Sequence, residues 1–491
     1  MARRAKTVID ADGEDRRESG YYSTPSFVAD FLAHKALGYR PNTRIVLDPC
    51  VGKGELTAPF SRVGIGVTGI DLVDRGAGGC NRFVQADFLE LAAPASEGSL
   101  FDEHSELWQA DIIVANPPYN CHETDYIRSN KRRLVATFGK STALNMYSLF
   151  VRAIIDVARP GCLIALVVHD SFLTAVGHKD LRQYLFASCT LLNLHLCPTA
   201  LFADQGADVR TCLIIIEKGH RPGATVEVSN RPASVVEFRE VLRSDGFERR
   251  HLGEITLSGE QDNDEIVVGL PPALSALFDG PRLGQIAPCV TGVSTGNDAK
   301  YISSVPRTGF TVPFYKNPAG RRFHAEPDGY IIDDFNREAR IVPNFIVRNR
   351  DLLMKGGLSC SSMGVAFGAT VRPPDTLCGV NPNVIVGEDD KWWLLAYLNS
   401  RLCLYLLRGV LIRSNMVTAG YASRIPTPQF EARTKTQIGD LAREAYRNAL
   451  IGCDTAQQKS QIDLLVEENL GLEPDIVGLL HTFAADPIRL T

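Results

Sequence analysis

Short apolar runs alternate with glycine-containing or polar turns through the first half of the chain. The runs lie at positions 44–47, 66–71, 83–89, 111–115, 163–168 and 210–218. Short, largely apolar runs are typical of strands buried on both faces of a sheet. Between them lie segments with helical spacing, as at Phe27, Val28, Phe31 and Leu32. The pattern predicts an α/β domain with a mostly parallel, doubly wound sheet.

The run at 111–115 ends in an unusual sequence, Asn116-Pro117-Pro118-Tyr119. Neither proline can donate to a strand ladder, so the chain must leave the sheet here, at the carboxyl end of a strand. Asn116 and Pro117 offer two carbonyl acceptors in fixed relation, and Tyr119 offers a flat ring. Such a set suits an exocyclic NH2 group on a planar base. A turn with an Asn cap and a buried Tyr explains the four residues equally well.

The run at 44–47 leads into a second recognisable turn, in which Asp48 is followed by Gly52 and Gly54. Strand, glycine turn and helix start allow a backbone to approach a ligand closely. The third glycine of a dinucleotide fingerprint is missing, and no Gly-Lys-Ser/Thr follows. A plain NAD site and a phosphate-binding P-loop are therefore disfavoured.

Two further acids follow predicted strands. Asp71 comes about 20 residues after the glycine turn, the usual offset for an acid that accepts the hydroxyls of a ribose. Asp87 could accept from an adenine amino group, and Phe88 could pack on the ring. Each acid by itself is more simply a strand-end cap. Acids after three successive strands, followed by Asn-Pro-Pro-Tyr, favour a ligand site at one edge of the sheet.

An earlier element opens the ordered part of the chain. Thr24 followed by Pro25 predicts a helix whose N-cap is Thr24 and whose first residue is Pro25. A helix N-terminus is a weak anion site, so a ligand carboxylate could bind here.

The bulk composition narrows the class of protein. A chain of 491 residues with 45% hydrophobic and 22% charged residues predicts two or three globular domains. The net charge of −5 argues against a protein that coats nucleic acid, but not against a local basic cleft. The 12 cysteines form no Cys-x-x-Cys pair, so neither zinc nor disulfides are indicated, and a reduced cytoplasmic setting is expected. No signal peptide or membrane span is expected.

The order of these motifs resembles that of S-adenosylmethionine-dependent DNA adenine-N6 methyltransferases. It is most similar to the gamma class, typified by the TaqI methyltransferase, in which a Thr-Pro element precedes the glycine turn. The resemblance implies a Rossmann-like class I methyltransferase domain, with S-adenosylmethionine as cofactor, S-adenosylhomocysteine as product and no metal. The cofactor-binding residues that it implies are Thr24, Pro25, Asp48, Cys50, Gly52, Gly54, Asp71, Asp87, Phe88 and Asn116.

The resemblance also implies how the target base is held. Asn116 and the Pro117 carbonyl would accept from the adenine N6, and Tyr119 would stack on a base flipped out of duplex DNA. The segment 144–150 looks like the family's Asn-Leu-Tyr helix, and 159–168 looks like its Pro-Gly-strand step. The segment 201–204 is similar to one whose Phe stacks on the target, which makes Phe202 a candidate second aromatic wall.

The second half of the chain has a different composition. Short β-rich runs, many Gly and Pro residues and basic clusters predict a separate α+β domain. Segments 291–298, 381–386 and 424–428 resemble the family's target-recognition region. We expect a flexible arm at 1–20, a catalytic domain at 21–252, a target-recognition domain at 253–431 and an amphipathic helical segment at 432–491.

Basic side chains mark the expected contacts with DNA. Residues 120–143 are interpreted as a polar, basic loop that leaves directly from the Asn-Pro-Pro-Tyr turn, and contact with the DNA backbone is favoured over a merely solvated loop. The candidates in this loop and in the second domain are Arg128, Lys131, Arg132, Arg133, Arg321, Arg322, Arg348 and Arg350.

The sequence thus predicts a site-specific DNA adenine methyltransferase whose partner is double-stranded DNA, with a separate restriction endonuclease as a further candidate partner. The alternatives are methylation of another planar NH2, on protein glutamine or rRNA guanine, and a catalytically silent DNA-binding subunit. No nuclease pattern is recognisable, and the arm at 1–20 is too short for a nuclease domain.

Overall fold

The structure is a computed structural model that describes residues 21–76, 78–93, 106–119, 125–205, 209–364, 366–412 and 416–487. The predicted arm at 1–20 lies outside the described residues. The chain divides into two compact units, which are treated separately. The first unit comprises Met1–Ser258 with Asn263–Gly269, and the second comprises Gly259–Asp262 with Leu270–Thr491.

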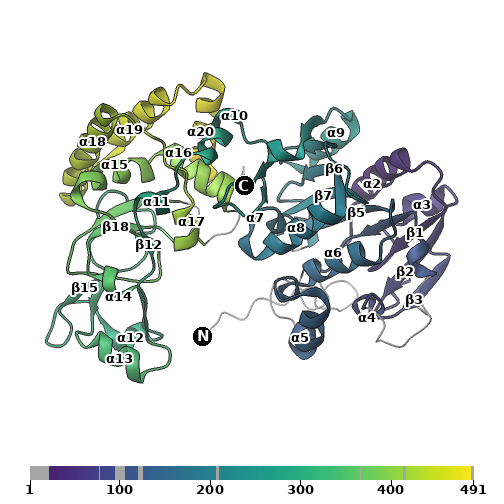
Figure 1. Ribbon diagram of the computed structural model, residues 1–491, viewed down its shortest axis with the longest axis horizontal. Helices are drawn as coiled ribbons and strands as arrows, with labels where there is room; N and C mark the ends of the chain where they lie inside the picture. Colours follow the sequence, from purple (N-terminus) through teal and green to yellow (C-terminus); the bar gives the residue numbers. More distant parts are fainter. Residues whose placement is uncertain are drawn as a thin grey trace. The chain divides into compact units, whose positions relative to one another are not determined.

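The first unit is built on a nine-stranded sheet (Figure 1). Its strands are β1 (Ile45–Asp48), β2 (Gly66–Asp71), β3 (Arg82–Gln85), β4 (Ile112–Ala115), β5 (Leu163–His169), β6 (Cys189–Leu196), β7 (Thr211–Lys218), β8 (Thr225–Ser229) and β9 (Glu248–His251). The order is β3-β2-β1-β4-β5-β7-β6-β8-β9. The first five strands in this order are parallel, β7 is antiparallel to β5 and β6, and β9 is antiparallel to β8. The predicted α/β class with a mostly parallel sheet is confirmed.

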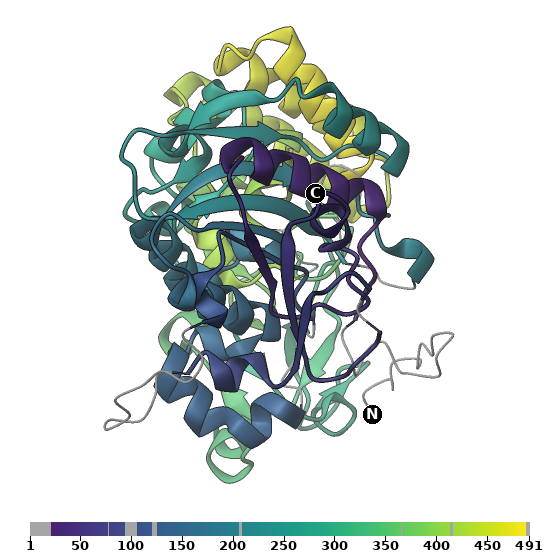
Figure 2. The ribbon, with the colours of Figure 1, turned by 90° about the vertical axis from the view of Figure 1, so that its right-hand side faces the viewer.

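Alternate residues of the central strands face two helical layers, because successive side chains of a strand point to opposite faces. Val46 packs with α2 (Ser26–Tyr39), α3 (Ala58–Arg62) and α9 (Val235–Ser244). Leu47 belongs to the core on the other face, which is covered by α4 (Phe88–Leu91), α5 (Asp125–Phe138), α6 (Met146–Val157), α7 (Ser171–Thr174) and α8 (Lys179–Ser188). Figure 2 shows α2, in purple, lying across the strands. Two-sided burial explains why these strands read as continuous apolar runs.

The interpretation of residues 120–143 as a loop is wrong for most of its length, because Asp125–Phe138 forms the helix α5. Ile127, Leu134 and Phe138 share one side of this helix and are buried in the core beneath it. Tyr126 and Val135 pack partly against the same core, and most of the other positions of the helix are polar. Tertiary burial of that narrow stripe, rather than composition, stabilises the helical conformation.

The predicted cap of the first helix is also wrong. Helix α2 begins at Ser26, its N-cap is Pro25, and no side chain caps it. Thr24 is nevertheless buried, at 5% exposure, and its hydroxyl serves another partner described below. The third strand is shorter than predicted, since β3 ends at Gln85 and Asp87 instead caps the short helix α4.

The second unit combines small sheets with helices, which confirms the predicted α+β class. One four-stranded sheet has the order β12 (Cys289–Val290), β21 (Asn383–Ile385), β18 (Gly357–Cys360) and β19 (Ala369–Arg372). The other has the order β14 (Ile302–Ser303), β16 (Gly329–Ile331), β15 (Val312–Tyr315) and β20 (Leu377–Cys378). A pair joins β13 (Val293–Ser294) to β17 (Ile346–Val347), and the first unit has a similar pair, β10 (Thr256–Leu257) with β11 (Glu265–Ile266). The shorter helices are α10 (Pro272–Ser275), α11 (Leu283–Ile286), α12 (Asp298–Tyr301), α13 (Phe335–Ile341), α14 (Arg350–Leu353), α16 (Arg401–Leu404) and α17 (Ala419–Ser423).

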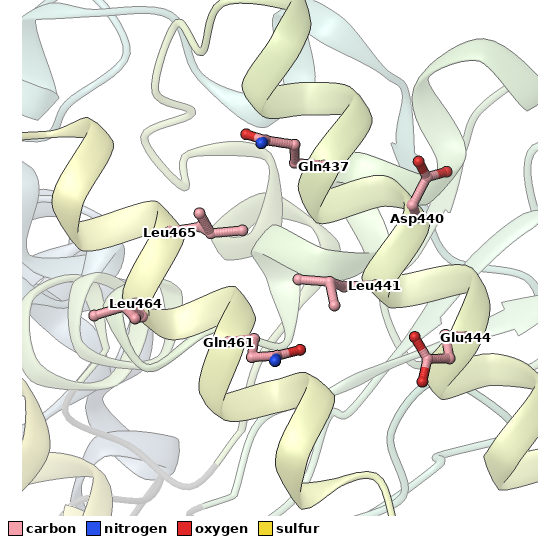
Figure 3. A pocket seen from close by; sticks show the side chains of 7 residues that line it. All are labelled: Gln437, Asp440, Leu441, Glu444, Gln461, Leu464 and Leu465. Carbon is pink, nitrogen blue, oxygen red and sulfur yellow. The ribbon is translucent and has the colours of Figure 1, made fainter.

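The last part of the second unit is helical, as predicted. Helix α15 (Glu388–Leu398) is followed, further along the chain, by α18 (Ala432–Leu450), α19 (Ala456–Asn469) and α20 (Pro474–Ala485). A hollow of about 430 Å³ lies between α18 and α19. Figure 3 shows Leu441 and Leu465 pointing toward it from the two helices. Among the described residues no single helix is long and apolar enough to cross a membrane.

Candidate active site

Three of the predicted site residues gather at the carboxyl ends of adjacent parallel strands. Asp48 is the last residue of β1, Asp71 is the last residue of β2, and Asn116 directly follows β4. The backbone N–H of Gly52 donates to Asp71 Oδ2 at 2.9 Å, and the nearby backbone of Asn116 lowers the pKa of the Cys50 thiol in part. The structure therefore brings the glycine turn, two of the acids and the Asn-Pro-Pro-Tyr sequence into one site.

The glycine turn depends on glycine at both positions. Gly52 and Gly54 have φ angles of +54° and +85°, in the left-handed region that other residues rarely adopt. A Cβ atom on Gly52 would lie 2.4 Å from a ring carbon of Tyr21, and one on Gly54 would lie 2.7 Å from the Gly78 carbonyl oxygen. The ring of Tyr21 thus packs directly on the turn, a contact that no larger residue would allow.

The electrostatics of the site are dominated by Asp48, which is only 2% exposed. Burial raises the pKa of this carboxyl to about 8, although the backbone N–H of Cys50 donates to it and lowers the pKa in part. The nearby charges of Asp71 and Glu55 raise the pKa further. A cationic ligand would favour the ionised form of Asp48, so this carboxyl is suited to a positively charged group.

Asp71 retains acceptor capacity for a ligand. Its Oδ2 accepts from Gly52 N, and its Oδ1 accepts from Val73 N at 3.1 Å. An ionised carboxylate has about four lone-pair positions, and these two bonds occupy two of them. The remaining positions are available for hydroxyl donors such as those of a ribose.

Strands β2 and β3 pair so that Asp71 lies opposite Gln85, the last residue of β3. Asp87, two residues after Gln85, therefore lies at the same end of the sheet as Asp71. The Asp87 carboxylate accepts from Leu89 N at 2.9 Å and from the hydroxyl of Tyr126, on α5, at 2.6 Å. The neighbouring Phe88 is 2% exposed and packs against Phe150, with ring centroids 5.4 Å apart. Its predicted contact with an adenine ring therefore stays a prediction.

The side-chain amide of Asn116 is held on both sides. Its Nδ2 donates to the carbonyl oxygen of Tyr22 and to Thr24 Oγ1, each at 3.0 Å. Its Oδ1 accepts from the hydroxyl of Tyr119. Burial raises the pKa of Tyr119 well above its ordinary value, so this phenol stays neutral and donates. One lone pair of Oδ1 remains for a second donor.

Pro117 supplies the second acceptor of the predicted pair. Its carbonyl oxygen accepts no backbone hydrogen bond from the residues that the structure describes. Because Pro117 directly follows Asn116, the two oxygens belong to one rigid segment. The pair is thus able to receive two N–H groups of the same ligand.

Three aromatic rings form a cluster beside these acceptors. The ring of Tyr22 stacks on that of Tyr119 with centroids 5.9 Å apart, and Phe202 lies 6.0 Å from Tyr119 and 6.2 Å from Tyr22. Tyr119 and Phe202 are 4% and 0% exposed. A flat ligand between Tyr22 and Tyr119 would need the rings about 7 Å apart, twice the ~3.4 Å spacing of stacked bases, so the observed 5.9 Å separation leaves no room for one.

Sequence reasoning named Thr24 but missed the other residues of the segment that crosses this site, which we call the strap (residues 21–24). The backbone of Ser23 exchanges two hydrogen bonds with the side chain of Gln205, at 2.8 and 2.7 Å. The hydroxyls of Ser23 and Tyr21 both donate to Glu55. The two tyrosines next to Thr24-Pro25 were the available signal, since large aromatic residues beside a motif mark a packing position.

The DNA-contact candidates differ in exposure. Arg128, Lys131 and Arg132 are exposed on one side of α5, whereas Arg133 pairs with Glu90 at 3.3 Å. In the second unit the exposed candidates are Arg321, Arg348 and Arg350, and Arg322 is half-buried with a pKa lowered by desolvation. The contact of these residues with DNA stays a prediction.

Comparisons with known proteins point to one family. Residues 90–255 match the family described as N-6 DNA Methylase. The type II methyltransferase M.BanIII of Aneurinibacillus aneurinilyticus is 25% identical over 217 residues, which are 38% of this chain and 37% of that protein. M.BsuBI of Bacillus subtilis, also a type II methyltransferase, is 27% identical over 233 residues, 42% of this chain and 45% of that protein. The matched region spans less than half of either relative.

Solved structures share the fold at low sequence identity. The type IIL restriction-modification enzyme MmeI, solved in complex with DNA, has a TM-score of 0.62 at 11% identity, over 97% of this chain and 79% of that chain. A nuclease-deletion mutant of the type ISP restriction-modification enzyme LlaGI, with a DNA substrate mimic, has a TM-score of 0.55 at 12% identity, over 87% and 54%. The agreement with MmeI extends through both units.

The family match contains the Asn-Pro-Pro-Tyr sequence, and the relatives with similar sequences are methyltransferases. The mostly parallel sheet and the fold shared with MmeI agree with it. Residues 90–255 of the chain are therefore similar to the N-6 DNA methylase family, whose members use S-adenosylmethionine.

Proposed function

We propose that the chain transfers a methyl group from S-adenosylmethionine to the exocyclic N6 of an adenine flipped out of duplex DNA, at a specific sequence. The observation that carries this proposal is the acceptor pair of Asn116 Oδ1 and the Pro117 carbonyl, beside the buried rings of Tyr119 and Phe202. Two adjacent acceptors match the two hydrogens of an amino group on a flat base.

The residues at the carboxyl edge fit the cofactor chemically. The glycine turn lets the backbone approach a ligand, Asp48 suits a cationic group, and Asp71 has lone pairs for ribose hydroxyls. Asp87 is the candidate acceptor for the adenine amino group, with Thr24, Pro25, Cys50 and Phe88 as neighbours in the predicted set. When bound, S-adenosylmethionine supplies an electrophilic methyl group and leaves as S-adenosylhomocysteine.

The chain's own residues act mainly by positioning. The adenine N6 is a weak nucleophile because its lone pair is delocalised into the ring. Hydrogen bonds from N6 to Asn116 Oδ1 and to the Pro117 carbonyl would favour a more tetrahedral nitrogen, with its lone pair free for methyl transfer. Tyr119 and Phe202 would replace the stacking that the base loses on flipping, about 1–3 kcal/mol per base.

Asn116→Ala tests this proposal directly. We expect the variant to lose methyl transfer to an adenine-containing duplex by at least about 100-fold, because one of the two N6 acceptors is gone. Cofactor affinity by calorimetry and duplex affinity by fluorescence anisotropy should persist. Full activity of the variant would contradict the acceptor role, and absence of methyl transfer by the wild-type chain would favour a silent DNA-binding subunit.

The acceptor pair alone suits other planar amino groups, so the substrate class needs its own test. We infer duplex DNA because the second unit follows the catalytic sheet and resembles a target-recognition region. Mass spectrometry of the wild-type reaction on duplex DNA, rRNA and a glutamine peptide separates these substrates. We further propose a modification role in a restriction-modification system, with a separate endonuclease, which predicts resistance of the modified site to that endonuclease.

A further inference from the structure

We propose that Thr24 is a positioning residue for methyl transfer, because its hydroxyl holds the Asn116 amide in the orientation that the Tyr22 carbonyl selects, with Oδ1 facing the target amine. This inference rests on the proposed function, since it concerns the same amino group. It assigns a role in turnover to a residue that the sequence had placed only among the cofactor-binding set.

The first step concerns the two hydrogens of Asn116 Nδ2. One points to the carbonyl oxygen of Tyr22 and the other to Thr24 Oγ1, both at 3.0 Å. A carboxamide nitrogen has two hydrogens and no acceptor capacity, so these two partners use it completely. The orientation of the amide is therefore set by its partners on the strap.

The second step concerns the reversed amide. If the amide turned by 180°, Asn116 Oδ1 would face the carbonyl oxygen of Tyr22, an acceptor facing an acceptor. Nδ2 would then meet the hydroxyl of Tyr119, which now donates to Oδ1. An amino group of the substrate would also meet an NH2 group instead of an oxygen. The reversed amide thus loses the hydrogen bond to the Tyr22 carbonyl, where two acceptors would meet, and it presents no acceptor to N6.

The third step concerns the rigidity of the strap. Thr24 is 5% exposed, and Ser23 before it is fixed by two hydrogen bonds with the Gln205 side chain. Pro25 after it limits the backbone and accepts from Val28 N at 2.9 Å at the start of α2. The hydroxyl of Thr24 is therefore held in place.

The test compares Thr24→Val with Thr24→Ser in the full chain. Valine keeps the shape of threonine but removes the acceptor, so we expect kcat for duplex methylation to fall about tenfold. Serine keeps the hydroxyl and should restore most of kcat. The KM for DNA and the calorimetric Kd for S-adenosylmethionine should change less than about twofold, since the inferred loss occurs in the transfer step. Thr43→Val, remote from the site, serves as a matched control.

A second measurement tests the hydrogen bonds of the Asn116 side-chain amide directly, independently of catalysis. In chains labelled with 15N-asparagine, the side-chain NH2 signals of Asn116, identified by their loss in Asn116→Ala, should exchange slowly with solvent. Thr24→Val should speed this exchange by at least about tenfold, and Thr24→Ser should not.

The possible results separate failure of the positioning role of Thr24 from failure of the proposed methyl transfer. Equal kcat of the wild-type and Thr24→Val chains would overturn the positioning role while the proposed function stands. A loss confined to cofactor Kd would also overturn it, since Thr24 would then serve the cofactor alone. Failure of the wild-type chain to methylate adenine would overturn the proposed function, whereas unchanged amide exchange in Thr24→Val would overturn the inferred hydrogen bond itself.

Discussion

Asp48 is the residue whose surroundings most alter its ordinary chemistry. It ends β1, is almost fully buried, and has a pKa raised to about 8 by burial. An aspartate in the unfolded chain has a pKa of about 3.9, so between these values the folded state holds a proton that the unfolded state lacks. Stability is therefore highest at low pH in this range and falls as the pH rises toward 8.

Asp48→Asn should remove this dependence, because an amide does not ionise. Relative to the variant, the wild-type chain without cofactor should lose up to about 1.4 kcal/mol of unfolding free energy per pH unit between pH 6 and 8. Urea unfolding at these two pH values, at fixed ionic strength, measures the difference. Parallel pH profiles for the two chains would show that Asp48 is already ionised in the folded state.

Individual residues of the site differ in how well the sequence predicts them. Asn116, Asp48 and Asp71 were found because each follows a recognisable apolar strand, and parallel strands place their carboxyl ends at one edge. The orientation of the Asn116 amide was not predictable. It depends on Tyr22 and Thr24, which are distant in sequence and approach only in the folded chain.

At the scale of elements, prediction succeeded where burial alone decides the structure. Strand β4 is buried at every residue, β2 buries Val67 and Ile70 in the cores on opposite faces, and both were predicted closely. Strand β6 was missed because it carries buried polar residues. Within it, Asn193 accepts from the hydroxyl of Tyr39 at 2.9 Å and donates to Glu227 at 3.0 Å. Such partners come from other elements, so no local pattern reports them.

Helix α5 is the element whose correction changes a functional expectation. As a helix, it presents Arg128, Lys131 and Arg132 at helical spacing on one exposed face. Its Tyr126 also donates to Asp87, so the helix that carries these charges touches the candidate cofactor edge. A helix fixes the spacing of the three charges, which a flexible loop would not.

Replacing these three residues by Gln should weaken duplex binding and reduce its salt dependence. Each phosphate contact that is lost makes the negative slope of log K against log salt shallower by about 1. The slope for the triple variant should therefore be shallower by up to about 3. Binding titrations between 50 and 200 mM salt measure the slope. Arg443→Gln, an exposed arginine paired with Asp440 on α18, is the control. An unchanged slope in the triple variant would remove α5 from the DNA interface.

At the scale of the whole molecule, the candidate cofactor residues and the basic clusters of the second half belong to different units. The glycine turn, the three acids and Asn116 all lie in the first unit, whereas Arg348 and Arg350 lie in the second. Composition correctly separated the two halves into α/β and α+β classes. The fine arrangement of the second unit was beyond sequence reasoning, because its strands are only two to four residues long.

This division predicts that DNA binding and cofactor binding can be weakened separately. Arg348 and Arg350 are exposed, and Arg350 donates to Asn336 within the same unit. Changing both arginines to Gln should lower duplex affinity and reduce the salt slope by about 2, one for each lost phosphate contact. The Kd for S-adenosylmethionine, measured by calorimetry without DNA, should not change. Neither arginine belongs to the first unit, which carries the glycine turn. Arg447→Gln, on the exposed side of α18, provides a control for the loss of one arginine charge. If the double variant binds the cofactor normally yet keeps the wild-type salt slope, the two arginines do not contact phosphate, and the basic residues of α5 become the stronger candidates for the backbone contacts.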